Sequence, residues 1–344
     1  MRAVIAKGDG TVEVVEAAMP TLAYDTDAIV RVTTAAICGT DLGLLREPGR
    51  LSRGTIIGHE FVGVVHSVGA GVRGIRPGDR VVASDYTACG RCWWCRQGAH
   101  WHCAERRFFG TGEAFGPLLA GGQAEFVRVP FADVVLAEIP EGLSDRDAVF
   151  LGDLVPTGWA ALERAAMRPG ETVVVAGGGP VGQIASLVAQ AIGSGPVVVS
   201  EPDAQRREVA ATLGAIAAAP AEAGAIVRDL TDGRGADVVI DCVGGATGLD
   251  AALGVVRRRG RICSVGVPHG DTWQAPVRDA FVREVSLSFA VGDAIRDREA
   301  FTPLVTAGLL TPSAIVSGSA PLAGARELYA RAAAMTELKA VIEL

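Results

Sequence analysis

The chain has 344 residues, enough for about two domains. Its net charge of −7 and isoelectric point near 5.4 argue against nucleic acid and membrane surfaces as partners. Hydrophobic residues make up 49% of the chain and aromatic residues only 5%, so we expect cores of small aliphatic side chains.

The first part of the chain, residues 1–150, has the pattern of a β-rich domain. Short alternating apolar runs with Gly and Pro between them predict strands at 28–34, 60–68, 79–85 and 122–129. The first 20 residues alternate in the same way, which predicts a strand rather than a secretory signal. Seven cysteines do not make a complete set of disulfides, and their spacing suits metal binding, so we expect a cytoplasmic protein.

Four cysteines follow in one short lobe, at about 86–106, with the spacing C-x2-C-x2-C-x7-C: Cys89, Cys92, Cys95 and Cys103. Four thiolates close the tetrahedral coordination of zinc and leave no position for substrate, so the cluster is interpreted as a structural zinc site. Disulfides and a nucleic-acid-binding zinc ribbon are alternatives, but the odd number of cysteines and the acidic charge disfavour them. His100 and His102 lie in the same lobe as alternative ligands.

A second group of metal-ligand residue types stands upstream of this lobe. Cys38 lies in the sequence Cys-Gly-Thr-Asp, and His59 lies in Gly-His-Glu at the start of a predicted strand. Catalytic zinc sites use such mixed ligands and keep one position open. The two groups together indicate an enzyme with two zinc ions per chain.

The second part, residues 151–292, alternates runs of β-branched residues with helical patterns. Strands are predicted at 172–176, 197–200, 236–241, 261–266 and 285–290, and helices at 181–191, 204–213 and 247–257. This alternation predicts an α/β domain with a doubly wound parallel sheet. No charged residue occurs between Glu171 and Glu201, but glycines and prolines interrupt this stretch too often for a membrane span.

Residues 214–224 form an Ala-rich patch without a predicted element. In the last segment, 293–344, we expect a helix at 322–334 and a strand at 339–344 that rejoins the first domain.

A glycine-rich turn lies between the first strand and first helix of this second part. Gly177, Gly179 and Gly182 match G-x-G-x-x-G, and Pro180 and Val181 open the helix. Such glycines permit a tight turn, close approach of a pyrophosphate and close helix–strand packing. The alternative is a tight turn that binds no ligand.

Glu201 follows 19 residues after the last glycine, where an acid that binds the adenosine ribose is expected. A carboxylate there would repel a 2′-phosphate, so NAD is predicted over NADP. Arg206 and Arg207 follow closely, and their positive charges would favour NADP instead.

The order of these motifs, together with Gly-Gly-Gln at 121–123, resembles the zinc-containing medium-chain alcohol dehydrogenases over essentially the whole chain. The resemblance implies a GroES-like catalytic domain, a Rossmann domain and a C-terminal segment that returns to the first domain. The stretch 198–202 is similar to that of polyol and butanediol dehydrogenases that use NAD.

The resemblance also implies roles for individual residues. Cys38, His59 and Asp153 correspond to the ligands of the catalytic zinc, with Asp153 where many members have cysteine, as in some secondary-alcohol and formaldehyde dehydrogenases. Capping of the next helix is the alternative role for Asp153. Glu60 corresponds to a glutamate beside the metal that can become a ligand, and Asp41 to the carboxylate that orients His59. The cofactor is expected to contact Thr157, Cys242, Val243, Val265, Gly266 and Val267.

The implied reaction is reversible hydride transfer between an alcohol (a secondary alcohol, diol or polyol) and NAD. Thr40 is expected to take the hydroxyl proton, but Gly43 stands where many members carry the histidine that passes this proton to solvent. A formaldehyde dehydrogenase or dismutase, a zinc-free quinone reductase and a non-enzymatic zinc and nucleotide sensor are the alternatives. We expect an alcohol or carbonyl substrate and a homodimer or homotetramer.

Overall fold

The computed structural model describes residues 1–47, 49–267, 270 and 272–344. Contacts between Cα atoms divide the chain into two compact units. The first unit consists of Met1–Asp153, Asp293–Thr302 and Val316–Leu344, and the second of Leu154–Gly292 and Pro303–Ile315. The C-terminal segment, which the sequence analysis treated as one piece from residue 293, is thus shared between the two units.

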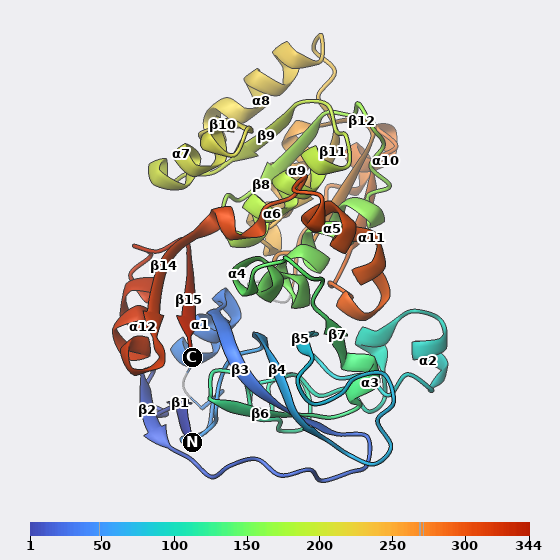
Figure 1. Ribbon diagram of the computed structural model, residues 1–344. Coiled ribbons are helices and arrows are strands. Elements are labelled where there is room, and N and C mark those ends of the chain that lie inside the picture. The colour runs from blue at the N-terminus through green and yellow to red at the C-terminus, as the bar shows by residue number, and fades with distance from the viewer. Residues whose placement is uncertain (48, 268–269, 271) are drawn as a thin grey trace. The chain divides into compact units, whose positions relative to one another are not determined.

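The first unit is built on a seven-stranded sheet in the order β14-β15-β3-β4-β5-β7, with β6 also paired to β3 (Figure 1). Its strands are β3 (Ala28–Ile37), β4 (Glu60–Val68), β5 (Arg80–Ala83), β6 (Phe126–Val129), β7 (Leu136–Glu138), β14 (Val316–Pro321) and β15 (Lys339–Glu343). A separate antiparallel pair consists of β1 (Arg2–Ala6) and β2 (Val12–Glu16). The C-terminal strand β15 pairs with β3, so residues from both ends of the sequence meet in this sheet.

Short helices surround the sheet of the first unit. They are α1 (Gly39–Arg46), α2 (Trp93–Arg96), α3 (Ala132–Val135), α4 (Asp145–Ala148), α12 (Ala325–Ala333) and the 3-10 turns η1 (His100–His102), η2 (Val149–Gly152) and η4 (Leu322–Gly324). Helices α1 and α12 share a hydrophobic core with β15, to which Leu44, Leu328, Tyr329 and Ile342 contribute. The helix α12 is therefore packed against α1.

The second unit contains a six-stranded parallel sheet in the order β10-β9-β8-β11-β12-β13. Its strands are β8 (Val173–Ala176), β9 (Val197–Ser200), β10 (Ile216–Ala218), β11 (Ala236–Asp241), β12 (Val256–Ser264) and β13 (Ser286–Phe289). The chain reverses direction across the sheet between β10 and β11, which places a topological switch point beside β8. Right-handed crossovers then put helices on both faces of the sheet.

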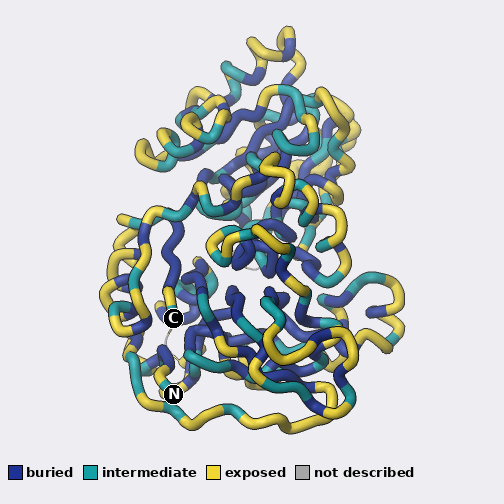
Figure 2. The backbone as a smooth tube through the Cα atoms, in the orientation of Figure 1, coloured by how far each residue is buried: buried dark blue, intermediate teal, exposed yellow. Residues whose placement is uncertain are grey.

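Helix α5 (Leu154–Arg164) precedes the first strand. The crossover helices between the strands are α6 (Pro180–Ala191), α7 (Ala204–Thr212), α8 (Pro220–Leu230), α9 (Gly245–Val255) and α10 (Val277–Val282). Helix α11 (Ala294–Thr306) and the turn η3 (Pro312–Ile315) follow the last strand. All four residues of β8 are buried, and Figure 2 shows the central strands in the colour of buried residues. A strand covered on both faces explains why this run is continuously apolar rather than alternating.

The predicted elements agree with the structure where the apolar periodicity is clear or β-branched residues are frequent. Strands β4, β9 and β11 have the predicted limits, and α6 begins one residue before its predicted start because Pro180 occupies its first position. Helix α8 was missed because it starts within the Ala-rich patch, where apolar periodicity is weak. Helix α5 was also missed, although it directly follows the Asp153 segment. The predicted α/β class with a doubly wound parallel sheet is confirmed.

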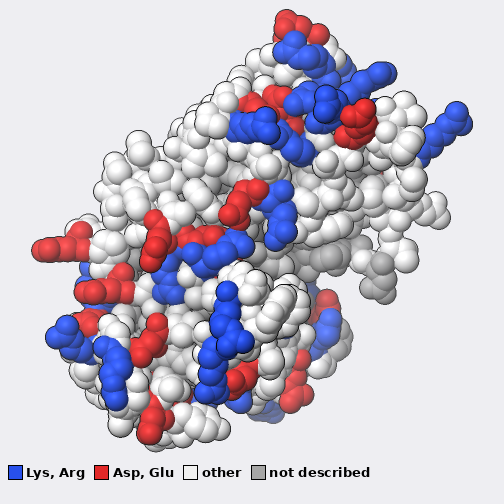
Figure 3. Space-filling view, turned by 90° about the vertical axis from the view of Figure 1, so that its right-hand side faces the viewer, with Lys and Arg blue, Asp and Glu red and all other residues white. Residues whose placement is uncertain are grey.

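Charged side chains of both signs lie next to one another over the face shown in Figure 3. In the described part of the chain, no helix is long and apolar enough to cross a membrane. The uncharged stretch between Glu171 and Glu201 forms β8, α6 and β9 of the second unit.

Candidate metal centres and dinucleotide site

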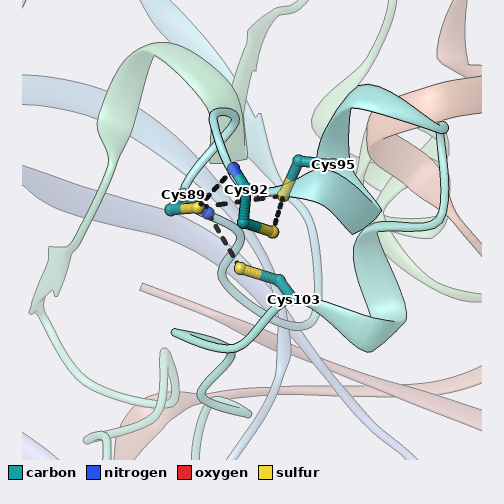
Figure 4. Close-up of side chains that lie close together, drawn as sticks. All are labelled: Cys89, Cys92, Cys95 and Cys103. Atoms are coloured by element: carbon teal, nitrogen blue, oxygen red, sulfur yellow. Dashed lines mark hydrogen bonds between the residues drawn. The ribbon is translucent and has the colours of Figure 1, made fainter.

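The four clustered cysteines converge on one point in the first unit (Figure 4). Cys89 and Cys92 precede α2, Cys95 lies in α2, and Cys103 follows η1. All four are free thiols, and their sulfur atoms lie within 4.8 Å of one another. The Sγ atoms of Cys92 and Cys95 are 3.5 Å apart, and those of Cys89 and Cys95 are 4.0 Å apart. The arrangement has the donor set of a tetrathiolate zinc site.

Backbone N–H groups of the lobe point at these sulfur atoms. The N–H of Cys89 donates to the Sγ of Cys103 at 3.2 Å, and that of Cys92 donates to the Sγ of Cys89 at 3.4 Å. Hydrogen bonds, chiefly from the backbone of Cys95, lower the pKa of the Cys92 thiol to about 6. Donors aimed at sulfur favour thiolates, and thiolates are the form that binds a metal.

The two histidines of the lobe have other partners. His100 bonds Asp293 through its backbone N–H at 3.0 Å and through its ring Nδ1 at 3.1 Å. The ring of His102 lies against Trp94, with centroids 5.1 Å apart. The contact with Asp293 ties the lobe to the segment that precedes α11.

The second cluster brings Cys38, His59, Glu60 and Asp153 together, with one ligand atom of each within 4.8 Å of the others. Cys38 caps the start of α1, His59 and Glu60 stand at the start of β4, and Asp153 lies between η2 and α5. The Asp153 Oδ2 is 3.5 Å from the Nε2 of His59 and 3.8 Å from the Sγ of Cys38. All four residues belong to the first unit.

Asp41 lies against the opposite side of the His59 ring, although neither the Nδ1 of His59 nor the facing Oδ1 of Asp41 has a hydrogen-bond partner among the described residues. The Nδ1 of His59 is 3.3 Å from the Oδ1 of Asp41, and the Oδ2 of Asp41 accepts the backbone N–H of Cys38 at 2.9 Å. The ring also meets Phe108 edge-on, with centroids 5.1 Å apart. With Nδ1 facing Asp41, the Nε2 of His59 faces Asp153 and Cys38 on the other side of the ring.

Glu60 forms an ion pair that sequence reasoning missed. Its Oε1 is 2.7 Å from the Nζ of Lys339 in β15, and both side chains are almost completely buried. The Glu60 Oε2 is also buried, and none of the described residues gives it a hydrogen-bond partner. From the sequence, Lys339 is predicted only to be the first residue of an apolar strand.

The electrostatics of this cluster favour a bound cation. Burial lowers the pKa of His59, but the negative charges of Asp41 and Cys38 outweigh burial and raise the pKa well above its ordinary value. Burial raises the pKa of the Cys38 thiol, so a thiolate there needs a compensating positive charge. Together with the unpartnered Oε2 of Glu60, this field suits a divalent ion among Cys38, His59 and Asp153.

Thr40 and Gly43 lie one turn apart on α1, directly after Cys38. Thr40 is half-buried. A Cβ atom at Gly43 would meet nothing within 4 Å, so the position has space for a side chain that the chain does not supply.

The glycine-rich turn of the second unit joins β8 to α6. Gly177 has a φ of +96°, and a Cβ at Gly182 would lie 1.8 Å from the carbonyl oxygen of Gly177, so both positions require glycine. A Cβ at Gly179 would meet only an Nη of Arg206, at 3.7 Å. The backbone is open there at the start of a helix, and this fits a pyrophosphate group.

Glu201 lies at this glycine turn. Its Oε2 accepts the backbone N–H of Gly178 at 2.6 Å, and its Oε1 accepts that of Asp203 at 2.9 Å. Arg207 donates to the carbonyl oxygens of Glu201 and Pro202, whereas the guanidinium of Arg206 lies beside the turn. The acid and one arginine are therefore both present where the adenosine ribose is expected.

Asp241, at the end of β11, joins the two loops that were expected to flank the cofactor. Its Oδ1 accepts the backbone N–H groups of Val243 and Gly244, and its Oδ2 accepts the hydroxyl of Ser264 at 2.7 Å. Its carbonyl oxygen accepts the N–H groups of the next loop at 265 and 266. An acid at a strand end, before a glycine turn, was the signal that sequence reasoning missed.

The expected cofactor residues occupy three places in the second unit. Thr157 lies in α5, Cys242 and Val243 follow β11, and the last three, Val265, Gly266 and Val267, follow β12.

Comparison with known proteins gives the class of this molecule. A family model for the alcohol dehydrogenase GroES-like domain matches residues 24–141, and one for zinc-binding dehydrogenases matches residues 180–307. A probable zinc-binding alcohol dehydrogenase of Mycobacterium tuberculosis is 34% identical over 335 residues, which are 97% of this chain and 86% of that protein.

Solved structures with the same fold are also alcohol dehydrogenases or zinc-binding dehydrogenases. The alcohol dehydrogenase TADH from Thermus sp. ATN1 has a TM-score of 0.96 and 37% identity, covering 100% of this chain and 99% of its own. A putative zinc-binding dehydrogenase from Sinorhizobium meliloti, bound to NADP, has a TM-score of 0.86 and 28% identity, with coverage of 100% and 99%.

The fold and these matches define an oxidoreductase of the zinc-dependent alcohol dehydrogenase type. The chain belongs to the zinc-containing medium-chain alcohol dehydrogenase family, as its motifs indicated. Membership implies zinc, a nicotinamide cofactor and small-molecule substrates.

Proposed function

We propose that the protein reversibly oxidises a secondary alcohol, diol or polyol with NAD, using one catalytic and one structural zinc per chain. The observation that carries the proposal is the convergence of Cys38, His59 and Asp153 on one point, with Thr40 two residues after Cys38 on α1. When bound there, zinc supplies a Lewis acid that favours the alkoxide form of an alcohol, and the nicotinamide supplies the hydride acceptor.

The residues of the chain position these groups and move the proton. Asp41 holds His59 so that its Nε2 faces the metal position, and Asp153 supplies a carboxylate oxygen. Thr40 lies two residues after Cys38, on the first turn of α1, and accepts the proton that leaves the substrate hydroxyl. Without a histidine at Gly43, the proton leaves Thr40 through water.

Replacing Thr40 with valine is expected to lower kcat by about 100- to 10,000-fold, the range that a single proton-transfer group contributes. Metal content should stay at two per chain, because Thr40 is not a ligand in this proposal. The Thr40→Ser variant keeps the hydroxyl and is expected to retain most of the activity. A kcat near that of the wild type in Thr40→Val would refute the role.

The choice of cofactor is expected to follow Glu201. Steady-state kinetics should give a kcat/KM for NAD at least about tenfold above that for NADP, since two like charges some 4 Å apart cost more than 1 kcal/mol near a protein surface. Glu201→Gln removes the charge and keeps an oxygen for the Gly178 N–H, while it gives up the bond from the Asp203 N–H. It should reduce the difference in kcat/KM between NAD and NADP, with Arg206 beside the turn as the cation for the phosphate. A preference of the wild type for NADP would overturn this part of the proposal.

The substrate class is tested with a panel of secondary alcohols, diols, polyols and aldehydes. Turnover of at least one alcohol with NAD is the expected result. Disproportionation of formaldehyde without added NAD would favour a dismutase, which Asp153 at the third ligand position also permits. Failure with every alcohol, despite two bound metals and bound NAD, would favour a sensor.

We also infer that the protein is a homodimer or homotetramer. Strand β13 lies at the edge of its sheet, and the apolar side chains of Leu287, Phe289, Phe281 and Val282 around it are exposed. An unpaired apolar edge of this kind favours self-association. A light-scattering mass equal to one 35.4 kDa chain would contradict the inference.

A further inference from the structure

A buried row of polar side chains leads from helix α12 to the candidate metal centre. Tyr329 donates its hydroxyl to the Oε1 of Gln123 at 2.8 Å. The Nε2 of Gln123 donates to the carbonyl oxygen of Ala36 at 3.1 Å and lies 3.5 Å from the Oδ2 of Asp41. The other oxygen of Asp41 faces His59. The proposed function uses neither Gln123 nor Tyr329.

Chemistry determines how the Gln123 amide is oriented. The carbonyl oxygen of Ala36 and the carboxylate of Asp41 only accept hydrogen bonds, so the NH₂ group must face them. The amide oxygen then faces Tyr329, whose hydroxyl can donate. The Ala36 carbonyl and the Asp41 carboxylate therefore allow one orientation only, which places a donor against Asp41, and the Tyr329 hydroxyl donates to the amide oxygen that remains.

The backbone is shaped to bring Gln123 to this place. Gly58, directly before His59, has a φ of +95°, and a Cβ there would lie 2.3 Å from the Cγ of Gln123. A Cβ at Gly122 would lie 2.2 Å from the ring of Phe61. Gln123 is completely buried, and Tyr329 is 4% exposed. The glutamine therefore packs directly against the turn that carries His59.

Gln123 supplies one of the two hydrogen-bond donors to the Oδ2 of Asp41. The other donor is the backbone N–H of Cys38, which belongs to the start of the same helix. Without the Gln123 donor, the Asp41 carboxylate keeps only the Cys38 N–H as a hydrogen-bond donor. The His59 ring, whose Nδ1 lies 3.3 Å from this carboxylate, would then shift with it. Residues that hydrogen-bond to the partners of metal ligands change the affinity of the site for its metal by orienting those ligands.

We propose that Gln123 and Tyr329 are positioning residues that fix the Asp41 carboxylate, and through it the His59 ring, for metal binding. The inference rests on the proposed metal site at Cys38, His59 and Asp153. Tyr329 acts only through Gln123, so its effect depends on the glutamine being present.

The test is the rate at which each bound metal passes to a chelator, measured on the full-length protein with cobalt in the catalytic position. Gln123→Leu is expected to release this metal about 10- to 100-fold faster and to shift the visible cobalt spectrum, because outer partners change metal affinity by this factor. Tyr329→Phe should have a smaller effect in the same direction. The metal of the four-cysteine cluster should be released at the wild-type rate.

Two comparisons separate positioning from general stability. Thr231→Val removes a buried hydroxyl that bonds Val227 and Gly235 in the second unit, and it should lower stability without changing metal release. The double variant Gln123→Leu/Tyr329→Phe should release metal no faster than Gln123→Leu alone, since the two act in series. Tyr329→Phe removes a single atom, so it remains informative if Gln123→Leu does not fold.

Unchanged release rates and an unchanged cobalt spectrum in both single variants, in a protein with two metals per chain, would overturn this inference alone. Equal, additive effects of the two substitutions would overturn the coupling between them. A wild-type protein that holds one metal per chain would overturn the proposed function and this inference with it.

Discussion

Replacing Asp153 with alanine is expected to leave one bound metal per chain and to lower kcat/KM for alcohol oxidation by about a thousandfold. The carboxylate is one of the groups that converge within 4.8 Å, and its loss leaves only Glu60 as a further candidate ligand, with one of its two oxygens paired to Lys339. A metal Lewis acid contributes several kcal/mol to transition-state stabilisation, and about 4 kcal/mol corresponds to a factor of about 1000. Elemental analysis and steady-state kinetics measure the two effects.

The matched variant is Asp153→Cys. Many family members have cysteine at this position, and a thiolate is a good zinc ligand, so this variant should keep two metals and much of the activity. Cys103→Ser, in contrast, should lose the metal of the cysteine cluster. If Asp153→Ala kept both metals and normal turnover, Asp153 would be a helix cap and not a ligand.

The second large effect is expected from Lys339→Met, which should destabilise the protein by about 3 to 5 kcal/mol. The substitution keeps a long side chain but leaves Glu60 as a buried charge without its partner, which is the costly way to break a buried ion pair. The Nζ of Lys339 also lies 5.6 Å from the ring centroid of Phe150, a contact that methionine partly replaces. Urea unfolding of wild type and variant gives the difference.

The double variant Lys339→Met/Glu60→Gln is the control for this prediction. It removes both charges and should recover a large part of the lost stability, since the cost lies in the unpaired carboxylate rather than in the missing amine. Equal stability of Lys339→Met and wild type would show that Glu60 is neutral or reaches water in the folded protein.

The sequence predicted those parts of the molecule whose signals are local. The four cysteines lie within 15 residues, so the lobe that joins them is short, and their meeting in space follows from their spacing. The glycine turn and Glu201 were predicted because one strand–helix–strand unit carries the whole fingerprint. Cys38 and His59 were grouped by their residue types, whereas Asp153, far from both in sequence, joined them only through the resemblance to the family.

The contacts of the candidate site that no local pattern revealed join residues that lie far apart in the sequence. Lys339 meets Glu60 across 279 residues, and Tyr329 meets Gln123 across 206. A lysine at the start of a strand and a tyrosine in an amphipathic helix are both usually exposed residues. The pairing of β15 with β3 brings Lys339 inside, and the core that α12 shares with α1 and β15 buries Tyr329. The Ala-rich start of α8 was missed for another reason, because its few large apolar residues give a weak helical period.

The position of β15 between β14 and β3 has a consequence for how the protein is made. The ribosome adds Lys339 279 residues after Glu60, when the entire second unit has already been synthesised. Until then Glu60 lacks its ion-pair partner and β3 lacks its neighbour β15. The first unit can therefore complete its sheet only after the second unit has left the ribosome's catalytic centre, so the two units cannot finish folding in the order in which they begin.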